Sequence, residues 1–260
     1  MRLTRVFVDG ELTTGSVVEL ARDTAAHLAK VLRARSGDEI VLFNGDGREY
    51  AGAIESVRGS RISAAIGSAR SVDRESFFPI TLVQCVPRGD RMDFIVQKAT
   101  ELGVARIVPV LSKRSVVRLD ETQAASKQTH WQAVAVSACE QCGRNRLPRI
   151  EPPRPLLSYL GELGAAADPA QILRLILEPD QPQQPANGAR AAGAEIAIGP
   201  EGGFAPEELE AFALCSFIPV GLGPRILRTE TAAIAALVVL QTRYGDMSGK
   251  SDSSSRPADA

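Results

Sequence analysis

Residues 195–237 decide the fold of this chain, with EIAIGPEGGFAPEELEAF over residues 195–212 and VGLGPRILRTETAAIAAL over residues 220–237. Each segment places a glycine-rich loop between a short apolar strand and the start of a helix. In the first loop, Gly199, Gly202 and Gly203 follow the strand at 196–198, and glycines permit positive φ and close approach of a ligand to the backbone. Pro206 then suits the first turn of a helix.

The second loop adds positive charge to the same arrangement. Arg225 and Arg228 follow its glycines and precede a helix that is expected to start at Thr229. In an open α/β sheet, loops at the carboxyl ends of neighbouring strands form one crevice, where ligands usually bind. We therefore expect one pocket, with backbone amides from the first loop and guanidinium groups from the second.

The remainder of the chain divides into two regions with different patterns. Over residues 1–72, short apolar segments alternate with glycine-containing turns, and one helix is expected over residues 23–33. This predicts a small β-rich domain, closed or nearly closed into a barrel. Over residues 73–246, strands alternate with helices, which predicts a mostly parallel sheet with helices on both faces. Because Pro219 lies within the last strand, that strand is expected either at an edge or with an unpaired amide position at this residue.

The composition sets limits on partners and location. The chain has 260 residues, of which 44% are hydrophobic, and a net charge of −1, so affinity for RNA must come from local basic patches. Its longest apolar run, residues 232–240, is too short to span a membrane, and the N-terminus lacks a signal-peptide pattern. We expect a cytoplasmic protein that does not enter a membrane. Residues 247–260 are polar and are expected to form a disordered tail.

The cysteines do not predict a metal centre. Cys139 and Cys142 form a CxxC late in a long helix expected from about Asp120, and His130 is the only histidine near them. A structural zinc site needs a fourth ligand, which no familiar spacing supplies. Reduced thiols packed on a helix are therefore the expectation, without a bound metal.

The two loops resemble the cofactor-binding knot of the SPOUT superfamily of RNA methyltransferases. More closely, they resemble the RsmE-type family, which methylates N3 of a uridine in 16S ribosomal RNA of the small subunit. The same resemblance is carried, in the expected order, by HLAKVLR at 27–33, RMDFIVQKATELGV at 91–104, ACEQCGRNRLPRI at 138–150 and GPRILRTET at 223–231. It implies a PUA-like RNA-binding barrel over 1–72, a trefoil-knotted domain over 73–246, S-adenosylmethionine as cofactor, and a homodimer.

The resemblance also implies the residues of the site. Because N3 of uridine becomes negatively charged when deprotonated, a guanidinium can stabilise it, and Arg225 and Arg228 are the candidates. Glu201 and Glu230 are candidate bases or orienting groups, although the residues alone single out no general base. The cofactor is expected to contact Leu177, Glu178, Pro179, Gly199, Pro200, Glu201, Gly202, Gly203, Leu222, Gly223, Ile226, Leu227 and Thr229.

Three basic clusters are candidate contacts for small-subunit ribosomal RNA, expected within the 30S particle. A basic patch is the usual footprint of a module that contacts phosphates, although charge at a helix end can also simply complement the helix dipole. The clusters are Lys30, Arg33 and Arg35; Lys113 and Arg114; and Arg144, Asn145 and Arg146.

Three other functions fit parts of the chain. A knotted ribose 2'-O RNA methyltransferase would share the cofactor loops. A non-catalytic RNA-binding protein would be expected to have degenerate loops, whereas these glycines are intact. A nucleotide-dependent metabolic enzyme on a Rossmann sheet would have GxGxxG after the first strand of the domain, where residues 86–90 are VPRGD instead.

Overall fold

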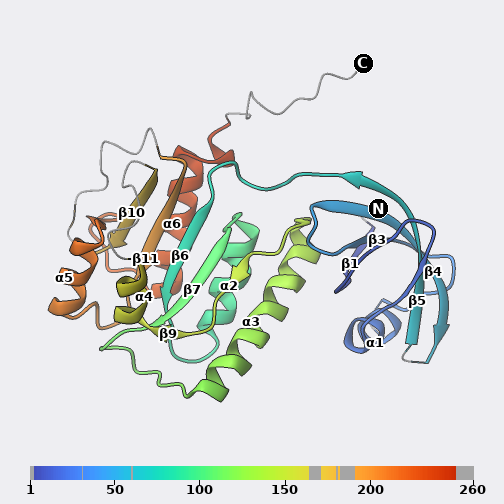
Figure 1. Cartoon of the computed structure of the whole chain (residues 1–260), viewed down its shortest axis with the longest axis horizontal. Helices are drawn as coiled ribbons and strands as arrows, with labels where there is room; N and C mark the ends of the chain where they lie inside the picture. Colours follow the sequence, from blue (N-terminus) through green and yellow to red (C-terminus); the bar gives the residue numbers. More distant parts are fainter. Residues whose placement is uncertain are drawn as a thin grey trace. The chain divides into compact units, whose positions relative to one another are not determined.

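The computed structural model describes residues 3–30, 32–59, 61–163, 171–179, 181 and 191–249. The chain forms two compact units, shown in Figure 1. The smaller contains Met1–Glu75 and Val136–Leu147, and the larger contains Ser76–Ala135 and Pro148–Ala260. The tail expected over residues 247–260 lies outside the described residues from residue 250 onward, and η2 covers Asp246–Ser248.

The smaller unit is built on a five-stranded sheet in the order β1-β3-β4-β5-β2. β1 and β3 are parallel, and the other pairs are antiparallel. No strand pairing joins β1 to β2 within the described ranges, so hydrogen bonds do not close this sheet into a complete barrel. Leu28 of the helix packs with Leu42, Ile54 and Ile62 of the strands. The elements are β1 (Thr4–Phe7), β2 (Val17–Glu19), α1 (Arg22–Lys30), β3 (Glu39–Phe43), β4 (Arg48–Arg58) and β5 (Arg61–Ser71).

The larger unit contains a seven-stranded sheet in the order β12-β10-β11-β6-β7-β8, with β9 also paired to β7. All of its strand pairs are parallel. β12 lies at an edge, which confirms the position expected for a strand that contains Pro219. The strands are β6 (Ile80–Cys85), β7 (Arg106–Leu111), β8 (Arg149–Ile150), β9 (Arg154–Pro155), β10 (Ile172–Leu177), β11 (Gly193–Ile198) and β12 (Ile218–Val220).

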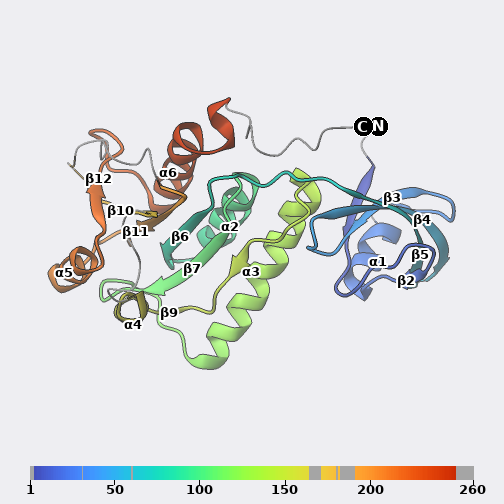
Figure 2. The ribbon, with the colours of Figure 1, turned by 45° about the horizontal axis from the view of Figure 1, so that its top comes forward.

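Helices cover both faces of this sheet (Figure 2). On one face, Met92 of α2, Trp131 of α3 and Leu237 of α6 belong to one core; on the other, Tyr159 of α4 and Phe212 of α5 belong to a second. The expected parallel sheet with helices on both faces is therefore confirmed. None of the described helices combines the length and the apolar character needed to cross a membrane. The helices are α2 (Arg91–Glu101), α3 (Glu121–Cys142), α4 (Leu156–Leu163), α5 (Pro206–Leu214) and α6 (Thr229–Arg243), and α3 belongs to the smaller unit from Val136 onward.

A buried carboxylate organises one side of the smaller unit. Glu49 of β4 is 3% exposed and accepts hydrogen bonds from Arg5 at 2.5 Å, Arg74 at 2.6 Å and Arg70 at 2.9 Å. Burial alone would raise the pKa of this carboxyl, but the hydrogen bonds from the three arginines outweigh it and lower the pKa from 4.5 to about 2. Glu49 is therefore ionised at every physiological pH.

This lowered pKa predicts how acid affects the smaller unit. Because the folded pKa lies below the unfolded one, the stabilisation is fully present above pH 4.5 and is lost as the pH falls towards about 2. We expect the wild type to lose about 3 kcal/mol from this group over that range, and Glu49→Gln to lack this loss. Chemical unfolding at several pH values measures it, with Glu39→Gln, at an exposed carboxylate, as the control. Equal acid sensitivity of the wild type and Glu49→Gln would contradict the assignment.

Candidate functional site

The two glycine-rich loops and the end of β10 enclose one cavity in the larger unit. Its volume is about 310 Å³, at the lower end of the range for sites that bind small molecules. It lies at the carboxyl ends of β10, β11 and β12, where open parallel sheets usually bind ligands. The lining residues are Leu177, Glu178, Pro179, Ile198, Gly199, Pro200, Glu201, Gly203, Leu222, Gly223, Arg225, Ile226, Leu227, Arg228, Thr229 and Ala232.

Hydrogen bonds to its carbonyl groups hold the first loop in place. The hydroxyl of Thr229, the first residue of α6, donates to the carbonyl oxygen of Gly199 at 3.0 Å. The guanidinium of Arg114 donates to the carbonyl oxygen of Gly202, also at 3.0 Å. Gly203 has a φ of +68°, which side chains rarely permit. The first loop is thus attached both to the second loop and to the segment after β7.

The acidic residues of the site differ in their surroundings. Glu178 lines the cavity and is half-buried, and burial raises the pKa of its carboxyl above the ordinary value. Glu201 also lines the cavity, and its Oε1 lies 2.5 Å from Nη1 of Arg91. Glu230 does not line the cavity, and its Oε1 lies 4.0 Å from Nε of the same arginine. The two carboxylates that were candidate bases therefore share one cation.

The two candidate arginines lie at the mouth of the cavity. Arg225 and Arg228 line it, and both side chains are exposed. Among the described residues, no ion pair joins either guanidinium to a carboxylate. Between them, Ile226 is 89% exposed. Two uncompensated cations and an apolar side chain thus face outward from one short loop.

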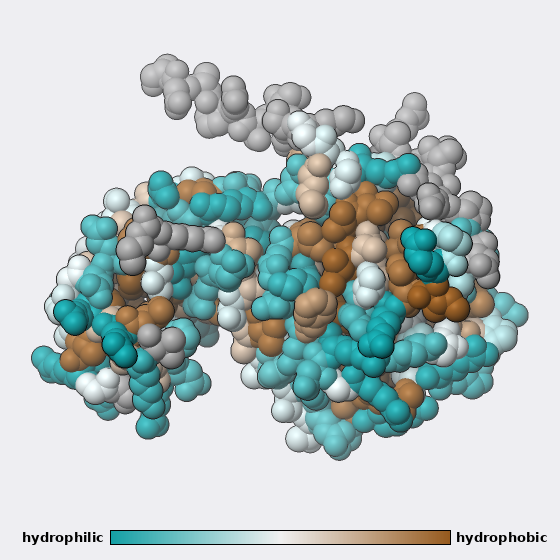
Figure 3. All heavy atoms as spheres, turned by 180° about the vertical axis from the view of Figure 1, so that it is seen from behind, coloured by the Kyte–Doolittle hydropathy of each residue, from teal (hydrophilic) through white to brown (hydrophobic). Residues whose placement is uncertain are grey.

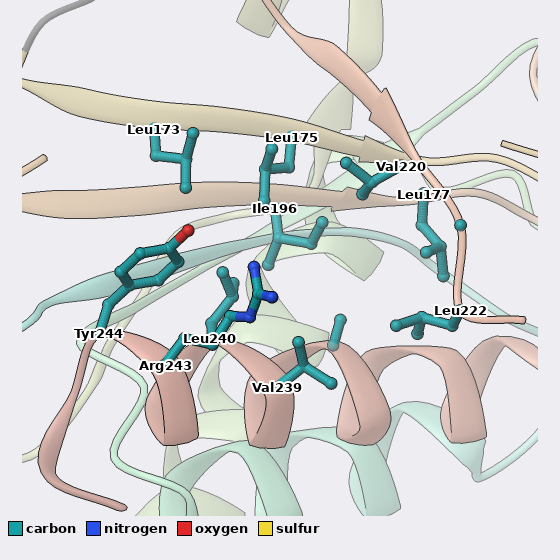
Figure 4. A pocket seen from close by; sticks show the side chains of 12 residues that line it. Leu173, Leu175, Leu177, Ile196, Val220, Leu222, Val239, Leu240, Arg243 and Tyr244 are labelled. Atoms are coloured by element: carbon teal, nitrogen blue, oxygen red, sulfur yellow. The ribbon is translucent and has the colours of Figure 1, made fainter. Parts of the chain in front are cut away.

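A second, smaller pocket adjoins the cavity on the α6 face of the sheet (Figure 4). Leu177 and Leu222 line both pockets, and most of the remaining lining is aliphatic. Arg243 and Tyr244 are the polar side chains at its other end. Its volume of about 30 Å³ is too small for a cofactor. We therefore place the functional site in the larger cavity.

The described residues include no group of three or more His, Cys, Asp or Glu side chains placed to hold a metal ion. The four cysteines form no disulfide; Cys139 is buried and Cys142 is partly buried at the end of α3. A hydrogen bond with Cys142 and, after it, burial raise the pKa of Cys139 far above its ordinary value. Its thiol is thus protonated at neutral pH.

Comparisons with known proteins match a part of each unit to a known domain family. Residues 74–241 match the family model of an RNA methyltransferase domain, and residues 20–66 match that of an RNA methyltransferase PUA domain. Ribosomal RNA small subunit methyltransferase E of Buchnera aphidicola is 32% identical over 95% of this chain and 99% of that protein. The protein of the same name from Bacillus subtilis is 33% identical over 81% of this chain and 84% of its own length. The chain belongs to the ribosomal RNA small subunit methyltransferase E family.

Two solved structures of methyltransferases resemble this chain over nearly its whole length. A putative methyltransferase from Legionella pneumophila, in complex with bound S-adenosylmethionine, has a TM-score of 0.84 and 38% identity, and covers 95% of this chain and 100% of its own. Ribosomal RNA small subunit methyltransferase E from Neisseria gonorrhoeae, bound to S-adenosyl methionine, has a TM-score of 0.83 and 35% identity, and covers 94% and 99%. The RsmE-type resemblance and the PUA-like domain are thereby confirmed.

The structure places the expected cofactor residues of this family member in one cavity, with one exception. Gly202 does not line it; the carbonyl of this residue binds Arg114 instead. Ile198 and Ala232 line the cavity although the sequence analysis did not select them. Both are apolar residues close in sequence to expected cofactor contacts, Ile198 at the end of β11 and Ala232 in the first turn of α6. Their proximity to those contacts was the only sequence signal that could have identified them.

For two residues of the third basic cluster, the prediction of RNA contact is wrong. Arg144 is only 4% exposed, and its guanidinium pairs with the carboxylate of Glu75. Asn145 is 2% exposed, and its side-chain amide donates to the carbonyl oxygen of Val72 at 2.8 Å. These two residues support the smaller unit from inside and cannot reach an RNA phosphate. Arg146 is exposed and stays a candidate.

The other basic candidates lie on the surface of their units. Lys30, Arg33 and Arg35 are exposed at and just beyond the end of α1. In the larger unit, Lys113 is exposed and pairs with Glu207 at the start of α5. All four stay predicted RNA contacts, as does Arg114, which is also exposed while it binds the first loop.

Proposed function

We propose that this protein is a cytoplasmic enzyme that transfers the methyl group of S-adenosylmethionine to N3 of a uridine in 16S ribosomal RNA. The observation that carries the proposal is the single cavity between two glycine-rich loops, with Arg225 and Arg228 at its mouth. Family membership supports the reaction, and a relative that is 35% identical over nearly the whole chain is bound to S-adenosyl methionine. The expected trefoil knot is part of this proposal.

The cavity suits S-adenosylmethionine in shape and in charge. Leu177, Leu222 and Leu227 offer apolar surface for an adenine ring. A Cβ at Gly199 would lie 3.1 Å from the ring of Phe204, so a side chain here would require the ring or the loop to shift by a few tenths of an ångström. The carboxylates of Glu178 and Glu201 line the cavity. The ligand proposed for it, S-adenosylmethionine, carries a positively charged sulfonium. Backbone and apolar contacts would hold the adenosine, and the acidic side chains would complement the positive charge.

The chemistry requires little from the protein beyond alignment and charge stabilisation. When bound, S-adenosylmethionine supplies an activated methyl group, so the protein has to orient the acceptor. Loss of the N3 proton to solvent water leaves an imide anion, and a guanidinium beside it lowers the energy of this anion without exchanging a proton. Arg225 and Arg228 are exposed at the rim, where an RNA base would enter.

A nucleoside analysis tests this function. The protein would be incubated with S-adenosylmethionine and either naked 16S RNA or 30S particles from a strain that lacks the gene, followed by digestion and mass spectrometry. We expect N3-methyluridine, with the higher yield from 30S particles. A ribose 2'-O-methylated nucleoside would establish the knotted 2'-O methyltransferase instead, and an absence of any methylated product would support a non-catalytic RNA-binding protein.

We also propose that the protein acts as a homodimer. On α6, Val238 and Val239 are only partly covered although Leu237 and Leu240 beside them are buried, so apolar side chains lie on more than one face of the helix. Figure 3 shows an apolar patch on the larger unit, seen from behind the view of Figure 1. Apolar surface of this kind commonly marks an interface. Light scattering at micromolar concentration should give twice the chain mass of 27.7 kDa, and a monomeric mass would contradict the proposal.

A further inference from the structure

Arg91 lies beside one carboxylate of the first glycine-rich loop and one at the start of α6, although it belongs to neither element. It is the first residue of α2 and follows the loop after β6. Its Nη1 lies 2.5 Å from Oε1 of Glu201 in the first loop. Its Nε lies 4.0 Å from Oε1 of Glu230, the second residue of α6 after the second loop. One guanidinium on a third element thus lies near a carboxylate of the first loop and near a carboxylate that directly follows the cavity-lining Thr229.

The surroundings of Glu230 show why this cation matters. Its side chain is 17% exposed, and its Oε2 is buried without a hydrogen-bond partner within the described part of the chain. A buried carboxylate oxygen is costly unless a positive charge compensates it. Arg91 is the cation beside this carboxylate. The start of α6 is therefore held towards α2 by electrostatic attraction.

The neighbours of both carboxylates form the cavity wall. Glu201 itself lines the cavity, and Thr229, which precedes Glu230, lines it as well. Thr229 also accepts a hydrogen bond at 2.9 Å from the buried side chain of Gln84 in β6 while it donates to Gly199. A shift of either carboxylate would therefore move residues that border the cavity.

We propose that Arg91 is a positioning residue of the cofactor site, which sets the separation of the two loops through Glu201 and Glu230. The inference rests on the proposed function, because the ligand that the loops would receive is S-adenosylmethionine. In this proposal, Glu201 and Glu230 do not transfer protons. Together with Arg91 they form a clamp, a set of charge pairs that holds the first loop and the start of α6 in place. A pocket held ready in this way binds its ligand without the cost of ordering the loops.

The first test is the affinity for S-adenosylmethionine, measured by calorimetry. Arg91→Ala is expected to weaken binding by about tenfold or more, because the loops must then be ordered by the ligand. Arg91→Lys keeps the charge and should recover part of the affinity. Arg88→Ala, at an exposed arginine of the loop that precedes α2, is the matched control and should bind like the wild type. A merely structural role would lower the melting temperature but leave the affinity within twofold, and that result would overturn the proposal.

The second test needs no ligand. Hydrogen exchange of the free protein should be faster at residues 199–203 and 223–230 in Arg91→Ala than in the wild type, and unchanged in Arg88→Ala. Equal exchange of these loops in Arg91→Ala and the wild type would refute the clamp. If the wild type failed to bind S-adenosylmethionine, the proposed function would be wrong, whereas the exchange data would still decide whether Arg91 holds the loops.

Discussion

Replacing Gly203 by valine is expected to abolish binding of S-adenosylmethionine while the fold stays intact. Gly203 has a φ of +68°, and a β-branched residue in that region is strongly disfavoured. No atom lies within 4 Å of a Cβ added there, so backbone strain rather than collision is the reason. The loop would adopt another conformation, and the amides and carbonyls that border the cavity would turn away from the ligand.

Gly199→Val should lose binding for a different reason. Its Cβ would approach the ring of Phe204 to 3.1 Å, and this ring is buried against Phe212 with 4.9 Å between ring centres. Because this ring is packed in the core beneath α5, we expect the loop rather than the ring to move.

A matched control separates these effects from general strain. Gly59 of the smaller unit has a φ of +63°, and its added Cβ would also meet open space. Gly59→Val should therefore suffer similar local strain and yet bind S-adenosylmethionine normally in calorimetry. Circular dichroism would check the fold of all three variants. Wild-type affinity in both Gly199→Val and Gly203→Val would disprove the cofactor site.

Replacing Arg225 or Arg228 by alanine should separate cofactor binding from methyl transfer. The adenosine of the cofactor needs no cation at these positions, so the affinity for S-adenosylmethionine should stay within a few-fold. If a guanidinium stabilises the developing charge on uracil, methyl transfer to 16S RNA should fall by about 10² or more, comparable to the loss of one oxyanion-hole donor. Lys127→Ala, at an exposed cation of α3, serves as the control.

The dependence of RNA binding on salt distinguishes the two possible roles of each arginine. An arginine that only holds a phosphate should weaken RNA affinity when it is removed, and the salt slope should fall by about one unit. An arginine that acts on the base should reduce the rate at saturating RNA and leave the slope unchanged. Full rate together with full RNA affinity in both variants would show that the arginines are structural and that the proposed mechanism is wrong.

The elements around the cavity could be predicted because their signals are local. Pro206 is the first residue of α5 and Thr229 the first residue of α6, both where the sequence analysis expected helix starts. The edge position of β12 followed from Pro219, which has no N–H for a neighbouring strand. The glycine loops followed from glycine spacing, and their meeting in one cavity from the rule that parallel strands end at the same edge. The trefoil knot stays a prediction.

By itself, the sequence determined the β-rich pattern of the first region, the alternation of strands and helices in the second, the two cofactor loops and the arginines beside them. Each of these features depends on residues that are close together in the chain. Only the tertiary structure decided which charges are free to act. Arg144 was expected to contact RNA, but it is buried and pairs with Glu75. Arg91 was not singled out as a site residue, but it pairs with Glu201, which lines the cavity. The members of each pair are far apart in the chain, and a charged residue carries no local mark of its partner. Strand register and helix packing bring such charges together, so the structure alone separates an arginine that supports the fold from one that can meet a substrate.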